Sequence, residues 1–185
     1  ITAGTGRINS VNNAGIIGTD NASITLNANI INLSEAITTN NQNITIQGSE
    51  INLSGNTTLD TNTTGGGDIS INGNVNGNYD ITLTTGTGNI SFSGTIGETQ
   101  PVGNITANSS GITEFSGIVN ANSLTTDVGG STQLNGNITT TNNQTYNDFV
   151  NLLGNVSLNS SSGNGNINFG SIIDGNFNLQ LNSGN

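Results

Sequence analysis

The residue types that carry most enzyme chemistry are absent from this sequence. Its 185 residues include no His, no Cys and a single base, Arg7. No side chain is therefore a ready general base or thiol nucleophile, and a serine without a base is unreactive. Two carboxylates about 5–10 Å apart can hydrolyse glycosides; the candidates are Glu35 with Asp60, or Asp148 with an acid of a neighbouring repeat. Enzymes that act on acidic polysaccharides also need cations to hold the substrate, so we predict no enzyme, no catalytic residue and no cofactor.

One segment has a composition that suggests a calcium site. Gly65–Ile71 reads GGGDISI, which resembles the Gly- and Asp-rich nonapeptide repeats that bind calcium. The segment has no tandem copies, and Asn166 replaces the acid in its counterpart near the C-terminus. We predict a turn here and no metal ligands, with incidental calcium binding as a minor alternative.

Clusters of threonine raise ice binding as a second minor alternative. They are Thr38–Thr39, Thr57–Thr58, Thr84–Thr85 and Thr139–Thr141. An ice-binding face would need a flat array of Thr-x-Thr motifs at one repeat spacing, and these clusters do not recur in that way. The high β-propensity of threonine is the simpler explanation.

The overall composition disfavours several broad classes of protein. Eleven acids against one base give a formal charge of −10, which leaves no cations to displace counterions from phosphates. We therefore predict no nucleic-acid partner. Hydrophobic content is only 30%, but disorder also requires a high charge density, and only 6% of residues are charged. No apolar run approaches the ~18 residues of a transmembrane helix. A secretion signal and an initiator Met are also missing, so we expect a segment or mature portion of a longer protein.

A tandem repeat of twenty residues indicates how the chain folds. Ile24–Asn43 and Ile44–Thr63 agree at seven of twenty positions and share the run INLS. Apolar residues alternate within each block, but their parity changes between Leu26 and Ile31. In a strand, parity decides which face a side chain occupies, so a change of parity with both runs inward predicts a corner. About three short strands with corners in each repeat form one coil of a β-solenoid.

The same alternation continues to the end of the chain. Apolar positions recur at an offset of 21, and Gly65–Thr87 resembles Gly163–Asn185 at an offset of 98. Such repeats are typical of arrays in which each coil contacts only its neighbours. We predict an all-β parallel solenoid without helix, with about nine coils of roughly 20 residues. The predicted core positions are Ile24, Leu26, Ile31, Leu33, Ile37, Ile69, Ile71, Val75, Ile81, Leu83, Ile90, Phe92, Ile96, Ile105, Ile112, Phe115, Ile118, Leu124, Val128, Leu134, Ile138, Tyr146, Phe149, Val150, Leu152, Leu153, Val156 and Leu158.

Asparagine accounts for 37 of the 185 residues and fits the same architecture. Asn32 over Asn52 would lie one coil apart, about 4.7–4.8 Å, where stacked amides hydrogen-bond along the axis. Asn27 over Gln47 would do the same. Asn-Gly pairs tolerate left-handed backbone conformations at corners. They are Asn72-Gly73, Asn76-Gly77, Asn135-Gly136 and Asn164-Gly165.

The stretch Ser131–Ser160 carries a family resemblance. It reads STQLNGNITTTNNQTYNDFVNLLGNVSLNS. Its order of LNGxITTT, QTYNDxV and a strand ending in LNS resembles repeats of very large bacterial surface adhesins of the filamentous-haemagglutinin type. Gly88–Gly111 and the GNGNINF of Gly163–Phe169 are similar to the flanking parts of that unit. The resemblance covers about residues 65–185, whereas residues 1–64 match in repeat style only.

The resemblance implies a right-handed parallel β-helix in a secreted protein displayed on the bacterial cell surface, often exported by two-partner secretion. The N-terminal secretion domain of that family does not occur in these 185 residues. Residues 1–185 would then be one solenoid segment, with two to three regular coils in 1–64 and an adhesin-type unit in 65–185.

The function implied is a rigid stalk or matrix element in cell-surface or cell–cell attachment. Its partners would be copies of the same protein and glycans or proteins of host or neighbouring cells. An alternative from another class is a self-assembling extracellular filament joined end to end, because open solenoid ends are unpaired sheet edges.

Overall fold

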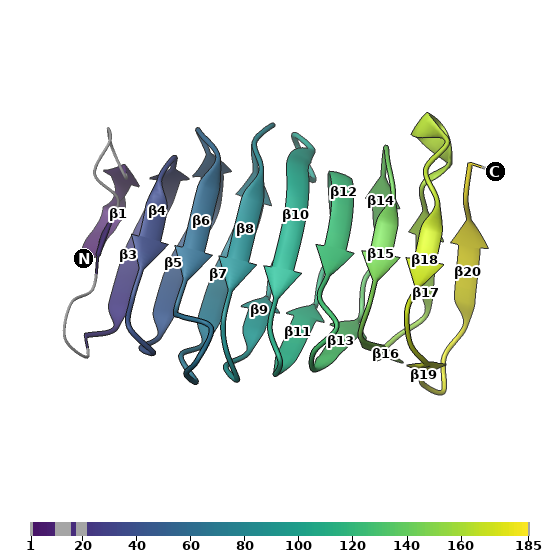
Figure 1. Cartoon of the computed structure of the whole chain (residues 1–185). Coiled ribbons are helices and arrows are strands. Elements are labelled where there is room, and N and C mark those ends of the chain that lie inside the picture. The colour runs from purple at the N-terminus through teal and green to yellow at the C-terminus, as the bar shows by residue number, and fades with distance from the viewer. Residues whose placement is uncertain (1, 10–15, 18–21, 185) are drawn as a thin grey trace.

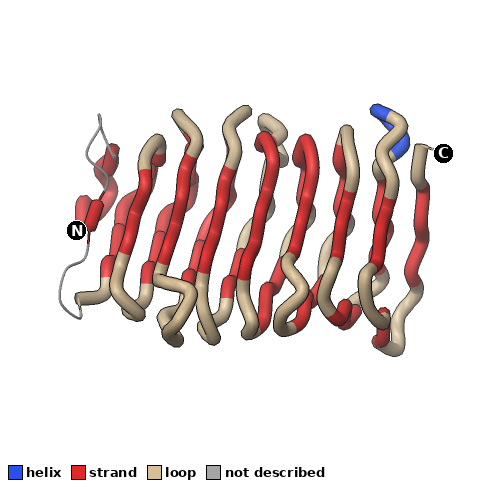
Figure 2. Tube along the Cα trace, viewed as in Figure 1, coloured by secondary structure: helices blue, strands red, loops and turns tan. Residues whose placement is uncertain are grey.

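The protein is an all-β parallel solenoid (Figures 1 and 2). The computed structural model describes residues 2–9, 16–17 and 22–184, with side chains for 6–9 and 22–184. Successive coils follow one long axis, so that β1 and β20 lie at opposite ends (Figure 1). Among the described residues the only helical element is the three-residue 3-10 turn η1 (Ser161–Gly163), and no helix there could span a membrane.

Twenty strands are assigned in the described residues. The first ten are β1 (Thr2–Asn9), β2 (Ile16–Ile17), β3 (Ile24–Leu33), β4 (Ala36–Thr38), β5 (Ile44–Leu53), β6 (Thr57–Asp60), β7 (Ile69–Asn76), β8 (Ile81–Thr84), β9 (Ile90–Phe92) and β10 (Val102–Asn108). The others are β11 (Ile112–Phe115), β12 (Val119–Thr126), β13 (Ser131–Leu134), β14 (Ile138–Thr140), β15 (Gln144–Tyr146), β16 (Phe149–Leu152), β17 (Val156–Asn159), β18 (Ile167–Phe169), β19 (Ile173–Asp174) and β20 (Leu179–Asn182).

Each coil contributes three β segments, which pair in parallel with their counterparts in the next coil. The first face consists of the amino-terminal halves of β1, β3, β5 and β7, followed by β9, β11, β13, β16 and β19. The second face consists of the carboxyl-terminal halves of the same four strands, Ile96, the first half of β12, and then β14, β17 and β20. The third face consists of β2, β4, β6 and β8, the second halves of β10 and β12, and then β15 and β18.

About seven turns are complete. The pairs β1–β2 and β19–β20 at the ends are partial turns within the described residues. The predicted number of about nine coils assumed a uniform spacing of roughly twenty residues. In the structure the spacing varies with corner length, from 19 residues between Val119 and Ile138 to 24 between Ile51 and Val75.

The predicted change of parity does produce a corner, but it lies inside a continuous strand. In β3, Ile24, Leu26 and Ala28 are buried, and then Ile31 and Leu33 are buried. The strand therefore bends between its two halves without losing its strand assignment, where three separate short strands were expected. The corresponding bends of β5 and β7 differ in length, which gives a register shift after Gln47.

Glycine makes the bend of β7 possible. Gly73 has a φ of +145°, and a Cβ at this position would lie 1.8 Å from the carbonyl oxygen of Gly48 in the coil before. A side chain is therefore excluded by both backbone conformation and space. Asn164 also has a positive φ, as predicted for a corner, whereas Asn135-Gly136 keeps negative φ values.

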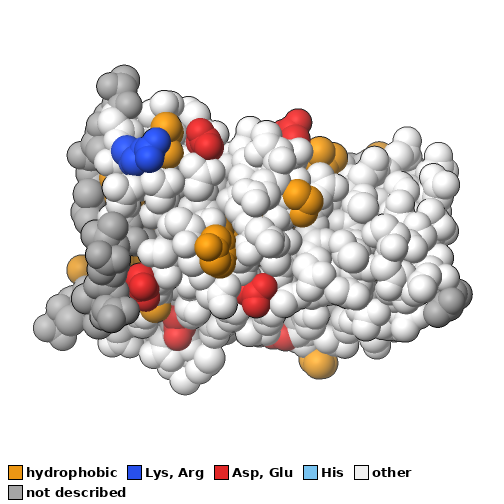
Figure 3. All heavy atoms as spheres, turned by 90° about the horizontal axis from the view of Figure 1, so that it is seen from above, with side chains coloured by type: hydrophobic (Ala, Val, Ile, Leu, Met, Phe, Trp, Pro, Cys, Tyr) orange, Lys and Arg blue, Asp and Glu red, His pale blue; other side chains and the backbone are white. Residues whose placement is uncertain are grey.

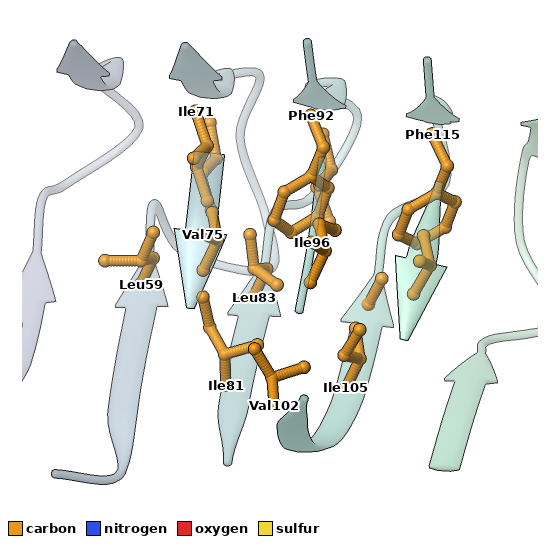
Figure 4. Packing of buried hydrophobic residues seen from close by; sticks show 14 of the residues in the cluster. Leu59, Ile71, Val75, Ile81, Leu83, Phe92, Ile96, Val102, Ile105 and Phe115 are labelled. Carbon is orange, nitrogen blue, oxygen red and sulfur yellow. The ribbon is translucent and has the colours of Figure 1, made fainter. Parts of the chain in front are cut away.

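The core consists of axial rows in which equivalent residues of successive coils stack. One row on the second face runs through every coil: Ile8, Ile31, Ile51, Val75, Ile96, Val119, Ile138, Leu158 and Leu181. A row on the first face includes Ile71, Phe92 and Phe115, and the two phenyl rings stack with centroids 5.3 Å apart (Figure 4). The rows place apolar side chains of all three faces against one another in a single core.

The predicted core is correct for most positions and wrong for five. Ile112, Ile118, Val128 and Leu153 are exposed, and Phe149 is only half-buried. Strand alternation explains two of these errors: β11 points Thr113 and Phe115 inward, and β16 points Val150 and Leu152 inward. The other three lie in loops between strands, where alternation does not apply.

Candidate functional site

The proposed carboxylate pair of Glu35 and Asp60 is not assembled by the fold. In the pairing of β4 with β6, Ala36 lies beside Thr58 and Thr38 beside Asp60. Asp60 is therefore three residue positions beyond the point opposite Glu35, or about 10 Å along the strand. This separation, with the spacing between strands added, exceeds that of a glycosidase pair. Asp60 accepts a hydrogen bond from the backbone N–H of Asn62 (2.7 Å), which stabilises the turn after β6.

The other acid candidate, Asp148, is the centre of a buried polar network. It lies between β15 and β16 and is 2% exposed. Thr126 Oγ1 donates to its Oδ1 at 2.8 Å, and Thr132 Oγ1 lies 2.9 Å from both carboxylate oxygens. These threonines belong to β12 and β13 of the preceding coils, so the carboxylate connects three segments that are distant in sequence.

The remainder of the QTYND motif extends this network into the core. Gln144 and Tyr146 alternate inward with Asp148, and both are fully buried. Tyr146 donates its hydroxyl to Gln144 Oε1 (3.1 Å), while Gln144 Nε2 donates to the carbonyl oxygens of Ile138 (3.2 Å) and Asn159 (2.9 Å). The ring of Tyr146 stacks on Phe169 with centroids 5.3 Å apart. Every polar atom named here has a partner, which is the condition under which a buried polar group is tolerated.

Burial dominates the electrostatics of the network. Removal from water raises the pKa of Asp148, an effect that the hydrogen bonds from Thr126 and Thr132 oppose and nearby Asp127 reinforces. Burial, with the negative charge of Asp148, also raises the pKa of Tyr146 well above its ordinary value. A phenol with a raised pKa is a poor acid. The chemistry of this site is hydrogen bonding between segments of the chain.

The calcium-like segment has a structural role that asparagine fills as well as aspartate. Asp68 donates its backbone N–H to Asn43 Oδ1 (2.9 Å) and accepts the backbone N–H of Asn89 at its own Oδ1 (2.7 Å). Asn89 Oδ1 in turn accepts the backbone N–H of Ile112 (2.8 Å). Each of these side chains precedes a strand of the first face and accepts from the next coil. We call Asn43, Asp68 and Asn89 the acceptor row.

The predicted amide ladder of the second face is confirmed. Asn52 Nδ2 donates to Asn32 Oδ1 (3.2 Å), and Asn32 Nδ2 donates to Asn9 Oδ1 (2.6 Å). Asn27 and Gln47 also lie side by side in the register of β3 and β5. Like the acceptor row, this ladder connects consecutive coils outside the apolar core.

A row of threonines on the outside of the third face was missed by sequence reasoning. Each is paired directly with the next: Thr58, Thr82, Thr106, Thr125 and Thr145. The spacings between them are 24, 24, 19 and 20 residues, so a search for one fixed repeat length does not detect the row. The Thr-x-Thr motif occurs in it once, at Thr82 and Thr84.

The surface has shallow hollows and dispersed charges. One hollow of about 420 Å³ beside the first bend is lined by seven residues without a charge, including Asn27, Gln47 and Asn72. Another of about 240 Å³ contains Asp68 and Glu114. Acidic side chains seen from above lie apart from one another (Figure 3). The described residues contain no group of three or more His, Cys, Asp or Glu positioned to hold a metal ion.

No protein-family model, no curated protein and no solved structure matches this chain. The resemblance to filamentous-haemagglutinin-type adhesins therefore stays an expectation from sequence. Sequence reasoning singled out the QTYND motif for that resemblance, and the structure gives the motif a physical role in the core. The threonine partners of Asp148 were not identified, because they lie 22 and 16 residues away and no local spacing relates them to it.

Proposed function

We propose that this chain is a rigid rod that acts as a stalk or matrix element in an extracellular bacterial surface protein. The observation that carries the proposal is the second-face row from Ile8 to Leu181, which stacks one aliphatic side chain from every coil. Bending the solenoid would separate these side chains on one side and break the ladder bonds beside them. Length and stiffness are the properties that such a row provides.

Secretion, surface display and attachment to neighbouring cells or host surfaces belong to the same proposal, and the sequence resemblance supports them. We also infer a right-handed coil, because crossovers between parallel strands are right-handed in about 98% of known cases. A stalk needs no catalytic centre of its own, and the dispersed acids keep its sides hydrated. Its partners in attachment would be glycans or proteins recognised by the protein of which the rod is part.

Removal of one coil tests the rod function. Deleting Ile24–Asn43 leaves Ile44 and Ile51 of β5 in the register that Ile24 and Ile31 of β3 occupied. The rod should fold and shorten by about 4.8 Å, the spacing between strands. Small-angle X-ray scattering measures this length. In a matched control, deletion of residues 24–33 removes half a coil and should unfold the adjacent turns.

An attachment assay with the displayed protein completes the test. Attachment should fall as whole coils are removed and recover when an equal number of coils is inserted elsewhere. Single substitutions of exposed lateral residues should leave it unchanged. Attachment that is lost with one lateral substitution, but keeps its strength when coils are removed, would show a ligand-binding module in place of a stalk.

Ice binding is a second candidate, which the outer threonine row favours. Five stacked hydroxyls and methyls at the strand spacing of about 4.8 Å form a regular, uncharged line. A single row is narrower than the flat Thr-x-Thr array that ice binding requires, so this function ranks second. Measurable thermal hysteresis that Thr106→Lys abolishes, and that Ser91→Lys on the first face preserves, would establish it. Absence of hysteresis would exclude it.

A further inference from the structure

The last coil leaves inward side chains of the solenoid uncovered. Leu181 of β20 stacks on Leu158 of β17 and continues the second-face row, yet it is 51% exposed. Within the described residues β19 and β20 are also the last strands of their sheets, so one edge of each carries unpaired backbone groups. Side chains from all three faces contribute to this uncovered surface. We call it the C-terminal face; it consists of Ile167, Phe169, Ile173, Leu179 and Leu181.

The other end of the same row differs. Ile8 of β1 occupies the equivalent position in the first coil, and it is only 8% exposed. A head-to-tail contact would therefore place the apolar C-terminal face against an end whose core residue is already covered. Two C-terminal faces, in contrast, are apolar on both sides and can cover each other.

The distribution of charge favours the same arrangement. Ten of the eleven acids lie between Asp20 and Asp148, and Asp174 alone follows them, so repulsion between two chains is weakest at this end. The one base does not favour head-to-tail stacking. Arg7 lies on the second face in register with Ile30, whereas Asp174 lies on the first face in register with Asn151.

We propose that two copies of this chain associate tail to tail through their C-terminal faces. The copies are related by a two-fold axis perpendicular to the solenoid axis, which makes the interface isologous. Such an axis reverses strand direction, so β20 lies antiparallel to the partner's β20 and its unpaired edge gains backbone hydrogen bonds. Contact of the two apolar faces removes Leu181 and its neighbours from water. The product is a closed pair of rods twice the length of one.

Sedimentation equilibrium over a range of concentrations tests the association. The protein should show a monomer–dimer equilibrium, and Leu181→Asp should weaken it by about tenfold or more, because a charge would enter the apolar contact. Val128→Asp is the matched control, since Val128 is an 82% exposed apolar residue in the loop between β12 and β13. It should leave the dissociation constant unchanged. An unchanged melting midpoint checks that each variant remains folded.

The orientation is tested with labels on single introduced cysteines, because the chain has none of its own. Spin labels at Asn182→Cys should report a short distance between the two copies, and labels at Asn9→Cys a distance of about two rod lengths. A protein that is monomeric at all concentrations would overturn the proposal. So would a dimer unaffected by Leu181→Asp, or an open series of larger species with a short distance only between positions 9 and 182, which indicates a head-to-tail filament.

Discussion

The corner that leads from the third face to the next coil is built in two ways. In the early coils a buried hydroxyl closes it: Thr61 donates to the carbonyl oxygen of Gly67 (2.7 Å), and Thr85 to that of Gly88 (2.8 Å). In the later coils the row of these hydroxyls reaches Asp148, whose carboxylate accepts from Thr126 and Thr132. The first arrangement is contained within one loop, whereas the second joins three segments from different coils.

The two regions differ in what their cores specify. Where the first-face row contains Ile44, Ile69 and Ile90, any in-register aliphatic residue satisfies it, and a regular repeat is sufficient. Where the same row contains Thr113 and Thr132, each inward hydroxyl needs a defined partner. A fully satisfied polar network fixes register more strictly than apolar packing does, because a displaced partner leaves a buried group unsatisfied. The later region thus gains specificity at the cost of burying a carboxylate.

The largest expected effect is the loss of apolar alternation, on which both regions depend. Val150→Asp places a charge in the core beside the polar network and should destabilise the protein by more than about 4 kcal/mol. Ile46→Asp should do the same in the early coils. Phe149→Asp is the matched control, since this half-buried side chain lies on the other side of β16 and should cost about 1 kcal/mol. Denaturant unfolding followed by circular dichroism measures the differences. Equal losses for Val150→Asp and Phe149→Asp would show that the alternation assigned to β16 is wrong.

The next effect separates the two kinds of corner. Asp148→Ala removes the acceptor of two buried hydroxyls and should cost about 2–4 kcal/mol. Thr61→Ala removes one local hydrogen bond and should cost about 1 kcal/mol. The same unfolding experiment compares them. If the two variants lose equal stability, Asp148 contributes no more than a local corner residue.

A smaller effect is a dependence on pH that only the later region should show. The pKa of Asp148 is raised above its ordinary value of 3.8, so the folded chain holds the proton more tightly than the unfolded chain does. The stability from this protonation is full below the unfolded pKa and is lost as pH rises through the folded pKa. Asp148→Asn retains an acceptor oxygen but does not titrate.

Unfolding midpoints measured from pH 3 to pH 7 test this sign. The unmodified protein should gain stability relative to Asp148→Asn as pH falls, and Asp174→Asn serves as the control for loss of one exposed surface charge. A gain in the opposite direction, with stability rising alongside pH relative to the variant, would mean that hydrogen bonding outweighs burial at Asp148.

Sequence periodicity predicted the early region better than the later one. The offset of 20 between Ile24 and Ile44 matches the register of β3 with β5, and the offset of 21 between Ile69 and Ile90 matches that of β7 with β9. These predictions succeed because inward aliphatic residues at even spacing determine both face and register.

The later region was predicted less well because its inward residues include polar ones. Thr113 is buried while its neighbour Ile112 is exposed, which inverts a pattern based on hydrophobicity. The network around Asp148 could not be anticipated either, since its donors depend on coil lengths that vary from turn to turn. The QTYND motif was recognised as unusual, but its role required the register of β12, β13 and β15.

The smallest expected effect concerns the acceptor row, where a carboxylate and an amide do the same work. Asp68 offers one oxygen to the backbone N–H of Asn89, as Asn89 does to Ile112. Asp68→Asn keeps that oxygen and should change stability by less than about 0.5 kcal/mol, whereas Asp68→Ala should cost about 1 kcal/mol. Added calcium should shift neither unfolding midpoint. A calcium-dependent gain in the unmodified protein that Asp68→Asn removes would instead establish the metal site that the glycine-rich segment suggested. Without such a gain, the aspartate is there for its acceptor oxygen alone, and the early region needs only local hydrogen-bond partners where the later one needs a network.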